Sequence, residues 1–130
     1  MSKSPKNSDP YSNAGVNIDV GNKLINQIKR SVISSHNINV IDGIGGFAGL
    51  YELNQKFKNP VIVACTDGVG TKLNLCVQYE KFTTIGQDLV AMCINDLVAS
   101  GAKPLFFLDY YATSKLELLQ SAKIIKGIAK

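Results

Sequence analysis

Two nearly continuous apolar stretches, residues 61–65 and 105–112, stand out from an otherwise alternating pattern of apolar and polar positions. Both are rich in β-branched or aromatic side chains, which is typical of strands covered on both faces. Elsewhere, apolar residues recur at intervals of three and four and predict amphipathic helices. We expect these over about residues 19–35, 84–100 and 114–130. Asp19 is the predicted N-cap of the first helix, and Ser114-x-x-Glu117 forms a capping box for the last.

This order of elements predicts an α/β (α+β) fold with a small sheet and flanking helices. The sheet is incomplete, because two strands alone leave edges and apolar faces uncovered. Residues 1–16 are rich in Ser, Asn, Lys, Pro and Gly and predict a flexible N-terminal arm. Residues 17–130 then form an incomplete domain that pairs with another subunit or with further sequence. The last helix reaches Lys130 without a capping residue, which indicates a truncated product.

The composition excludes several classes of function. The net charge of +4 is modest and the lysines are dispersed, so nucleic-acid binding has no support. No apolar run could span a bilayer and the N-terminus lacks the apolar core of a signal peptide, so we expect a cytoplasmic protein without membrane contact. The cysteines at 65, 76 and 93 lack metal-ligand spacing and are expected to be packed, reduced thiols. The single histidine, His36, excludes a zinc site built on several histidines.

The first predicted strand breaks into a charged, glycine-spaced turn. Gly68 and Gly70 remove side chains that would block a ligand from the backbone amides, and amides in such turns bind anions. Lys72 adds a positive charge, Thr71 a hydroxyl and Asp67 a carboxylate. This set suits a metal–phosphate group, but it is not a Walker A loop, because Thr71 stands where that motif requires Gly. A turn whose side chains are merely solvated is the alternative.

Residues 42–50 contain four glycines and admit three interpretations. Residues 43–48 formally satisfy a dinucleotide-binding fingerprint, but that fingerprint must open a long helix and little room for one remains before the next proline. The second interpretation is a flexible flap in which Gly45, Gly46 and Gly49 close over phosphates. An idle surface loop is the third.

The polar side of the second predicted helix carries Asp88, Asn95 and Asp96. At about 100° per residue, Asn95 falls about 20° and Asp96 about 80° from Asp88 around the helix. Acids that lie this close either bond to solvent and backbone or share a cation. A cation site here requires that folding brings Asp67 alongside.

Five motifs together resemble the phosphoribosylformylglycinamidine cyclo-ligase (AIR synthetase) family, in its N-terminal segment. They follow one another in the family's order, at residues 13–19, 45–47, 66–73, 86–97 and 104–112. Other ATP-using enzymes, such as selenophosphate synthetase, share the acidic turn and the Asn-Asp-Leu sequence. The unbroken aromatic strand favours the cyclo-ligases.

The resemblance implies a homodimer whose N-terminal halves pool their strands into one intersubunit β-barrel, with ATP near the subunit junction. It also implies a C-terminal α/β domain, absent here, and a downstream Gly-Gly-Glu-Thr motif that would join the metal site. The implied reaction converts formylglycinamidine ribonucleotide, a small-molecule substrate, to aminoimidazole ribonucleotide in de novo purine biosynthesis. Its cofactors are ATP and Mg²⁺.

This hypothesis divides the candidate residues into metal ligands and phosphate ligands. The metal ligands are Asp67 and Asp96, with Asp88 as a weaker candidate. The ATP- and phosphate-binding residues are Gly45, Gly46, Gly49, Asp67, Gly68, Gly70, Thr71 and Lys72. No residue is a convincing general base, so catalytic residues stay unassigned. The alternatives are a non-catalytic dimerisation fragment, another ATP-using relative, and a dinucleotide-binding module.

Overall fold

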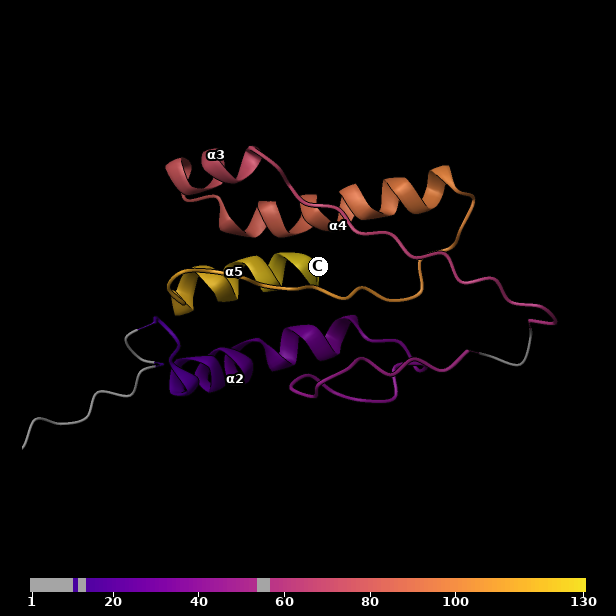
Figure 1. Cartoon of the computed structure of the whole chain (residues 1–130), viewed down its shortest axis with the longest axis horizontal. Helices are drawn as coiled ribbons and strands as arrows, with labels where there is room; N and C mark the ends of the chain where they lie inside the picture. Colours follow the sequence, from indigo (N-terminus) through magenta and orange to yellow (C-terminus); the bar gives the residue numbers. More distant parts are fainter. Residues whose placement is uncertain (1–10, 12–13, 54–56) are drawn as a thin grey trace, which may run out of the picture.

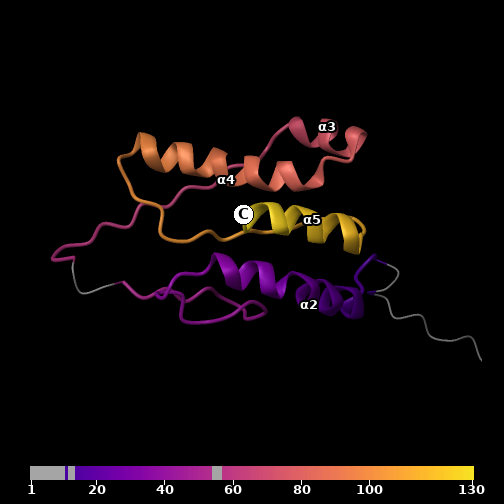
Figure 2. The ribbon, with the colours of Figure 1, turned by 180° about the vertical axis from the view of Figure 1, so that it is seen from behind.

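The computed structural model describes residue 11, residues 14–53 and residues 57–130, and the predicted N-terminal arm lies mostly outside these ranges. The elements of this part of the chain are α2 (Ile18–Ser35), α3 (Lys72–Tyr79), α4 (Phe82–Ala99) and α5 (Leu118–Ile128). The helices form layers: α5 lies between α2 on one side and α4 on the other, and α3 lies on α4 (Figures 1 and 2). The predicted helices are therefore present, and α3 is an additional short one.

The helix starts differ from those predicted. Asn17, not Asp19, is the N-cap of α2, because its side-chain oxygen accepts a hydrogen bond from the Val20 amide at 3.0 Å. Asp19 lies in the first turn, where its charge is favourable at the positive end of the helix dipole. The predicted capping box is wrong, because the helix begins after Glu117 and not after Ser114.

α4 and α5 cross at two facing glycines. A Cβ atom on Gly86 would collide with the Ile124 carbonyl oxygen, and one on Gly127 would collide with the Thr83 carbonyl oxygen. Glycine is required on both helices because their backbones approach too closely for any side chain to lie between them. This close crossing holds α5 in the middle of the layers.

Two apolar clusters fill the space on either side of α5. The first joins α2 to α5 and consists of Leu24, Ile28, Ala122 and Ile125. The second joins α3 to α4 and consists of Cys76, Phe82 and Ile85, with Val69 and Ile124 packed against it. Ile124 belongs to α5, so this helix takes part in both clusters. No helix in the described ranges combines the length and the apolarity that a bilayer crossing requires.

The two apolar stretches are extended, but they form no sheet within the described residues. The predicted α/β (α+β) class, with its small sheet and intersubunit barrel, is therefore wrong for this structure, whose described β pairing is one isolated antiparallel bridge between Val40 and Tyr51. Apolar β-branched residues favour extended backbone, but a ladder also needs a neighbouring strand. Within the described residues neither apolar stretch has a neighbouring strand, and Val61 and Tyr110 are 87% and 93% exposed.

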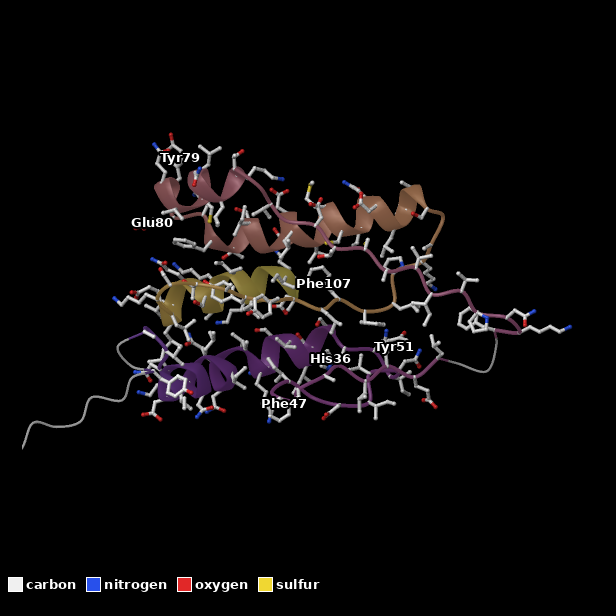
Figure 3. All side chains as sticks on the ribbon, in the orientation of Figure 1. His36, Phe47, Tyr51, Tyr79, Glu80 and Phe107 are labelled. Atoms are coloured by element: carbon white, nitrogen blue, oxygen red, sulfur yellow. The ribbon has the colours of Figure 1, made fainter. Side chains whose placement is uncertain are left out.

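One aromatic contact ties the loop after α2 to the second extended stretch. The Tyr51 ring, labelled in Figure 3, lies 5.1 Å from the Phe106 ring between centroids, with the planes tilted by 31°. Asn39 donates a hydrogen bond to the Tyr51 hydroxyl at 3.2 Å. These contacts hold the loop on the α2 side of the molecule.

Gly86→Ala should lower the free energy of unfolding by about 1–3 kcal/mol, because an added methyl group forces the two helices apart. The matched control is Gly21→Ala in α2, where no atom lies within 4 Å of the added Cβ. Alanine has the higher helix propensity, so the control should gain up to about 1 kcal/mol. Urea denaturation measures both changes. Equal changes in the free energy of unfolding for the two substitutions would show that the close crossing of α4 and α5 does not require glycine.

Candidate functional site

Two cysteines hold the segment before the glycine-spaced turn against α4. The Cys65 thiol donates to the Cys93 carbonyl oxygen at 3.3 Å, and the Cys93 thiol lies 4.0 Å from the Asp67 carbonyl oxygen. All three cysteines of the chain are free, as predicted, but Cys65 is exposed, so its predicted packing is wrong. No sequence pattern predicted this junction, because Cys65 and Cys93 are 28 residues apart and form no motif.

The carboxylates of Asp67 and Asp96 lie near this junction. Desolvation raises the pKa of the Cys65 thiol, and repulsion from Cys93, Asp96 and Asp67 raises it further. Charge repulsion weakens with distance and solvent screening, so both carboxylates must lie close to Cys65. Asp67 and Asp96, which the sequence analysis proposed as metal ligands, thus both act electrostatically on this thiol, one from the turn and one from α4.

The turn itself presents backbone amides at the start of α3. The Gly68 amide donates to Asp67 Oδ1 at 2.7 Å, and Gly70 has φ +59°, a left-handed conformation that favours glycine. Thr71 is the N-cap of α3, but its side chain makes no capping bond. Its hydroxyl can therefore serve an anion, which the helix dipole favours at this end, whereas the Leu73 and Asn74 amides already donate to the Gly70 and Thr71 carbonyl oxygens.

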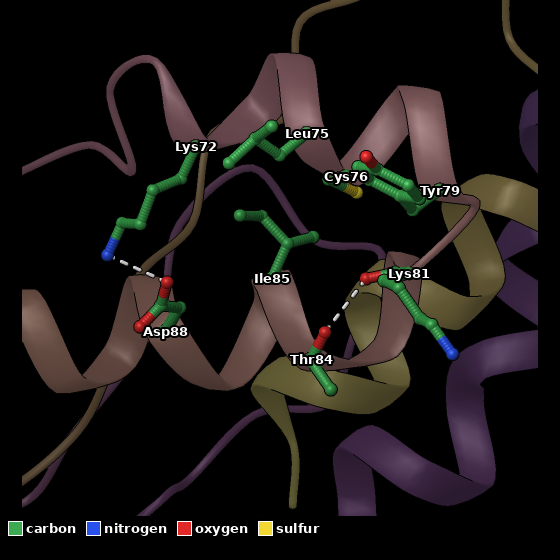
Figure 4. A pocket seen from close by; sticks show the side chains of 8 residues that line it. All are labelled: Lys72, Leu75, Cys76, Tyr79, Lys81, Thr84, Ile85 and Asp88. Atoms are coloured by element: carbon green, nitrogen blue, oxygen red, sulfur yellow. Dashed lines mark hydrogen bonds and ion pairs between the residues drawn. The ribbon is translucent and has the colours of Figure 1, made fainter.

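Lys72 pairs with Asp88, the weaker candidate metal ligand. Lys72 Nζ lies 2.7 Å from Asp88 Oδ2, and the two side chains are 44% and 42% exposed (Figure 4). An ion pair this exposed contributes about 0–1 kcal/mol. An incoming phosphate can therefore replace Asp88 as the partner of Lys72 at little cost. Within the described ranges, no group of three or more His, Cys, Asp or Glu side chains is placed to hold a metal.

The ion pair lies at one end of an open groove of about 500 Å³ between α3 and α4 (Figure 4). The groove is lined by Lys72, Leu75, Cys76, Tyr79, Lys81, Thr84, Ile85 and Asp88. Cys76 and Ile85 are buried at its floor, and burial raises the pKa of the Cys76 thiol. The lining is mostly apolar, with a lysine near each end.

The glycine-rich segment lies on the opposite side of the molecule. A Cβ on Gly45 would lie 3.9 Å from Ile25 of α2, and one on Gly49 would lie 2.9 Å from Leu108. The α5 layer separates α2 from α4 in both views, and Phe47 and Tyr79 mark the two sides (Figure 3). Within one chain the structure does not bring Gly45, Gly46 and Gly49 to the turn. No helix begins at residues 43–48, so the dinucleotide fingerprint lacks its structural context.

The turn, α3, α4 and the second extended stretch fall within a known family. The family described as "AIR synthase related protein, N-terminal domain" matches residues 47–130, and the chain belongs to it. This confirms the resemblance seen in the sequence.

Two curated relatives are each named phosphoribosylformylglycinamidine cyclo-ligase. One, from a Thermoanaerobacter species, is 55% identical over 120 residues, and the other, from Thermoanaerobacter pseudethanolicus, is 56% identical over 120 residues. Each alignment covers 92% of this chain and 35% of the relative. The chain therefore spans about a third of the length of the curated relatives it matches.

Asp88→Asn should increase the affinity of the chain for inorganic triphosphate several-fold, because it frees Lys72 while changing the free energy of unfolding by less than about 1 kcal/mol. Adding Lys72→Met to Asp88→Asn should abolish this gain in affinity. Isothermal titration calorimetry in Mg²⁺-free buffer measures both. A loss of affinity in Asp88→Asn would contradict the proposed competition between Asp88 and phosphate.

Proposed function

We propose that this chain is the N-terminal, ATP-binding part of an ATP-dependent cyclo-ligase that converts formylglycinamidine ribonucleotide to aminoimidazole ribonucleotide. Membership of the family and the names of the two relatives support this function. The observation that carries it is that the Cys65 and Cys93 contacts hold the segment with Asp67 against α4, while Lys72 Nζ lies 2.7 Å from Asp88 Oδ2 of the same helix. Acids and a lysine around one turn are the groups that a metal-bound triphosphate needs.

Asp67 and Asp96 suit Mg²⁺, which in phosphate sites takes one or two carboxylates and completes its shell with waters and phosphate oxygens. When bound, Mg²⁺ would neutralise charge on the phosphate oxygens. Asp88 is less suited, since its carboxylate already pairs with Lys72. In this proposal Asp88 holds the lysine in place until phosphate arrives.

The turn positions the phosphates, and its role in the reaction is electrostatic. Lys72, the Thr71 hydroxyl and the backbone amides of residues 68–70 offset the negative charge of the phosphoryl group that is transferred. The formyl oxygen of the substrate accepts this group from ATP, and the substrate's own nitrogen then attacks the activated carbon. The ring closes as phosphate departs, and ADP is the other product. No residue of this chain is proposed to carry the proton transfers.

We further propose a cytoplasmic homodimer. Apolar side chains on the two extended stretches support it, since Val61, Ile62, Leu108 and Tyr110 are all more than 60% exposed. In such a dimer the glycine flap of one copy could cover the turn of the other, a contact that the α5 layer prevents within one copy. Sedimentation equilibrium that finds only monomer at micromolar concentration would contradict the dimer.

The proposal is tested by grafting this chain in place of the matching third of the Thermoanaerobacter relative. Asp67→Asn and Asp96→Asn should each lower Mg²⁺-dependent ring closure by about 100-fold or more, because each removes a charge while keeping the shape. Asp19→Asn, on the α2 side, is the matched control and should keep full activity.

Formation of aminoimidazole ribonucleotide is the measurement, and circular dichroism checks that each variant is folded. Full activity of both site variants would remove the metal assignment. A folded parent protein that hydrolyses ATP without closing the ring would contradict the cyclo-ligase assignment.

A further inference from the structure

The proposed function makes no use of the two thiols at the junction of the turn and α4. We propose that Cys65 is a thiol-oxidation site that forms a reversible disulfide with Cys93 and so clamps the phosphate-binding turn to α4. The sulfur chemistry does not depend on the assigned reaction, because it needs only the two cysteines and a small-molecule disulfide.

The geometry of the junction carries this proposal. Cys65 Sγ lies 3.3 Å from the carbonyl oxygen of Cys93, and Cys93 Sγ lies 4.0 Å from the carbonyl oxygen of Asp67, two residues beyond Cys65. The Cys65 thiol therefore lies against the Cys93 backbone, and the Cys93 thiol lies against the segment that carries Cys65. A disulfide needs the sulfurs to approach to about 2.05 Å, with the Cβ atoms about 3.5–4.5 Å apart. Both side chains must turn away from these carbonyl oxygens for the sulfurs to meet.

The surroundings allow the remaining movement. The segment before the turn is extended and belongs to no ladder within the described ranges, so no β hydrogen bonds resist its displacement. Cys93 is anchored in α4 and is buried, whereas Cys65 is exposed. Cys76 is buried in the separate cluster of α3 and α4 and is not a competing partner.

Exposure sets the order of the chemical steps. The Cys65 thiolate attacks one sulfur of a low-molecular-weight disulfide, forms a mixed disulfide and releases one small thiolate. The Cys93 thiolate then attacks the Cys65 sulfur, forms the protein disulfide and releases the second small thiol. Two protein thiols lose two electrons and two protons, and the small disulfide gains them as two thiols.

The clamp changes the turn itself. Both thiol hydrogen bonds are lost, including the one that reaches the Asp67 carbonyl oxygen, and a covalent bond replaces them two residues before the acid. The position of Asp67 relative to Asp96 then depends on the redox state of the chain. The bridge also closes a loop of about 28 residues, which restricts the unfolded chain.

The test incubates the chain with glutathione disulfide at mildly alkaline pH, because the thiolate is the attacking form. We expect a loss of two hydrogens in the intact mass, a Cys65–Cys93 link in the peptide map, and a higher unfolding temperature that dithiothreitol reverses. Cys76→Ser is the matched control and should form the same link. Cys65→Ser should not form the link, and neither should Cys93→Ser or Cys93→Ala. Two substitutions are made at Cys93 because this residue is buried and a polar serine there could disturb folding.

Two results would overturn the proposal. One is a glutathione adduct that stays on Cys65 of the folded wild-type chain without closing to Cys93. The other is a link that includes Cys76. Neither result bears on ring closure by the grafted enzyme, so failure of the disulfide and failure of the cyclo-ligase assignment are distinguishable.

Discussion

The close crossing of α4 and α5 at Gly86 and Gly127 is the constraint on which the rest of the structure depends. Backbone contact between these helices lets α5 share one apolar cluster with α2 and lets Ile124 reach the cluster of α3 and α4. α4 is thereby fixed in the layer that carries Asp88, Cys93 and Asp96. With little regular structure besides the helices, the extended segments take their positions from this frame.

The site is held more loosely than the frame. Thiol hydrogen bonds are weak, and the exposed pair of Lys72 and Asp88 contributes about 0–1 kcal/mol. The turn before α3 therefore rests on α4 through contacts that a ligand can replace. Such weak contacts suit a site in which acids and a lysine must rearrange around a charged triphosphate, because strong resident contacts would compete with it.

Local patterns in the sequence predicted the helices. The same patterns did not predict features that depend on contacts between distant segments. Apolar periodicity located α2 and α4 because an amphipathic face is a local property, and Gly101, with φ +72°, follows the Ser100 C-cap of α4. The apolar stretches correctly indicated extended backbone but not the absence of a partner strand. Asp19 was the predicted cap of α2, and the backbone geometry gives this role to Asn17 instead.

The candidate site likewise combines features that local sequence predicts with contacts that it does not predict. Residue types around the turn predicted an anion site, and the helical spacing of α4 predicted a polar flank, but their meeting at Cys65 and Cys93 is a contact between segments far apart in the sequence. The separation of Gly45, Gly46 and Gly49 from the turn is likewise set by the layers and not by any local motif. Family membership supports the nucleotide chemistry.

The central claim is that Asp67 and Asp96 together hold one divalent cation beside the phosphates of ATP. Crystals grown with Mn²⁺ and a non-hydrolysable ATP analogue test it most directly, through the anomalous scattering of the metal. The account predicts an anomalous peak within coordinating distance of both carboxylates and of a phosphate oxygen. A metal bound to Asp88 instead, or a nucleotide seated away from the turn with no metal at either acid, would contradict it.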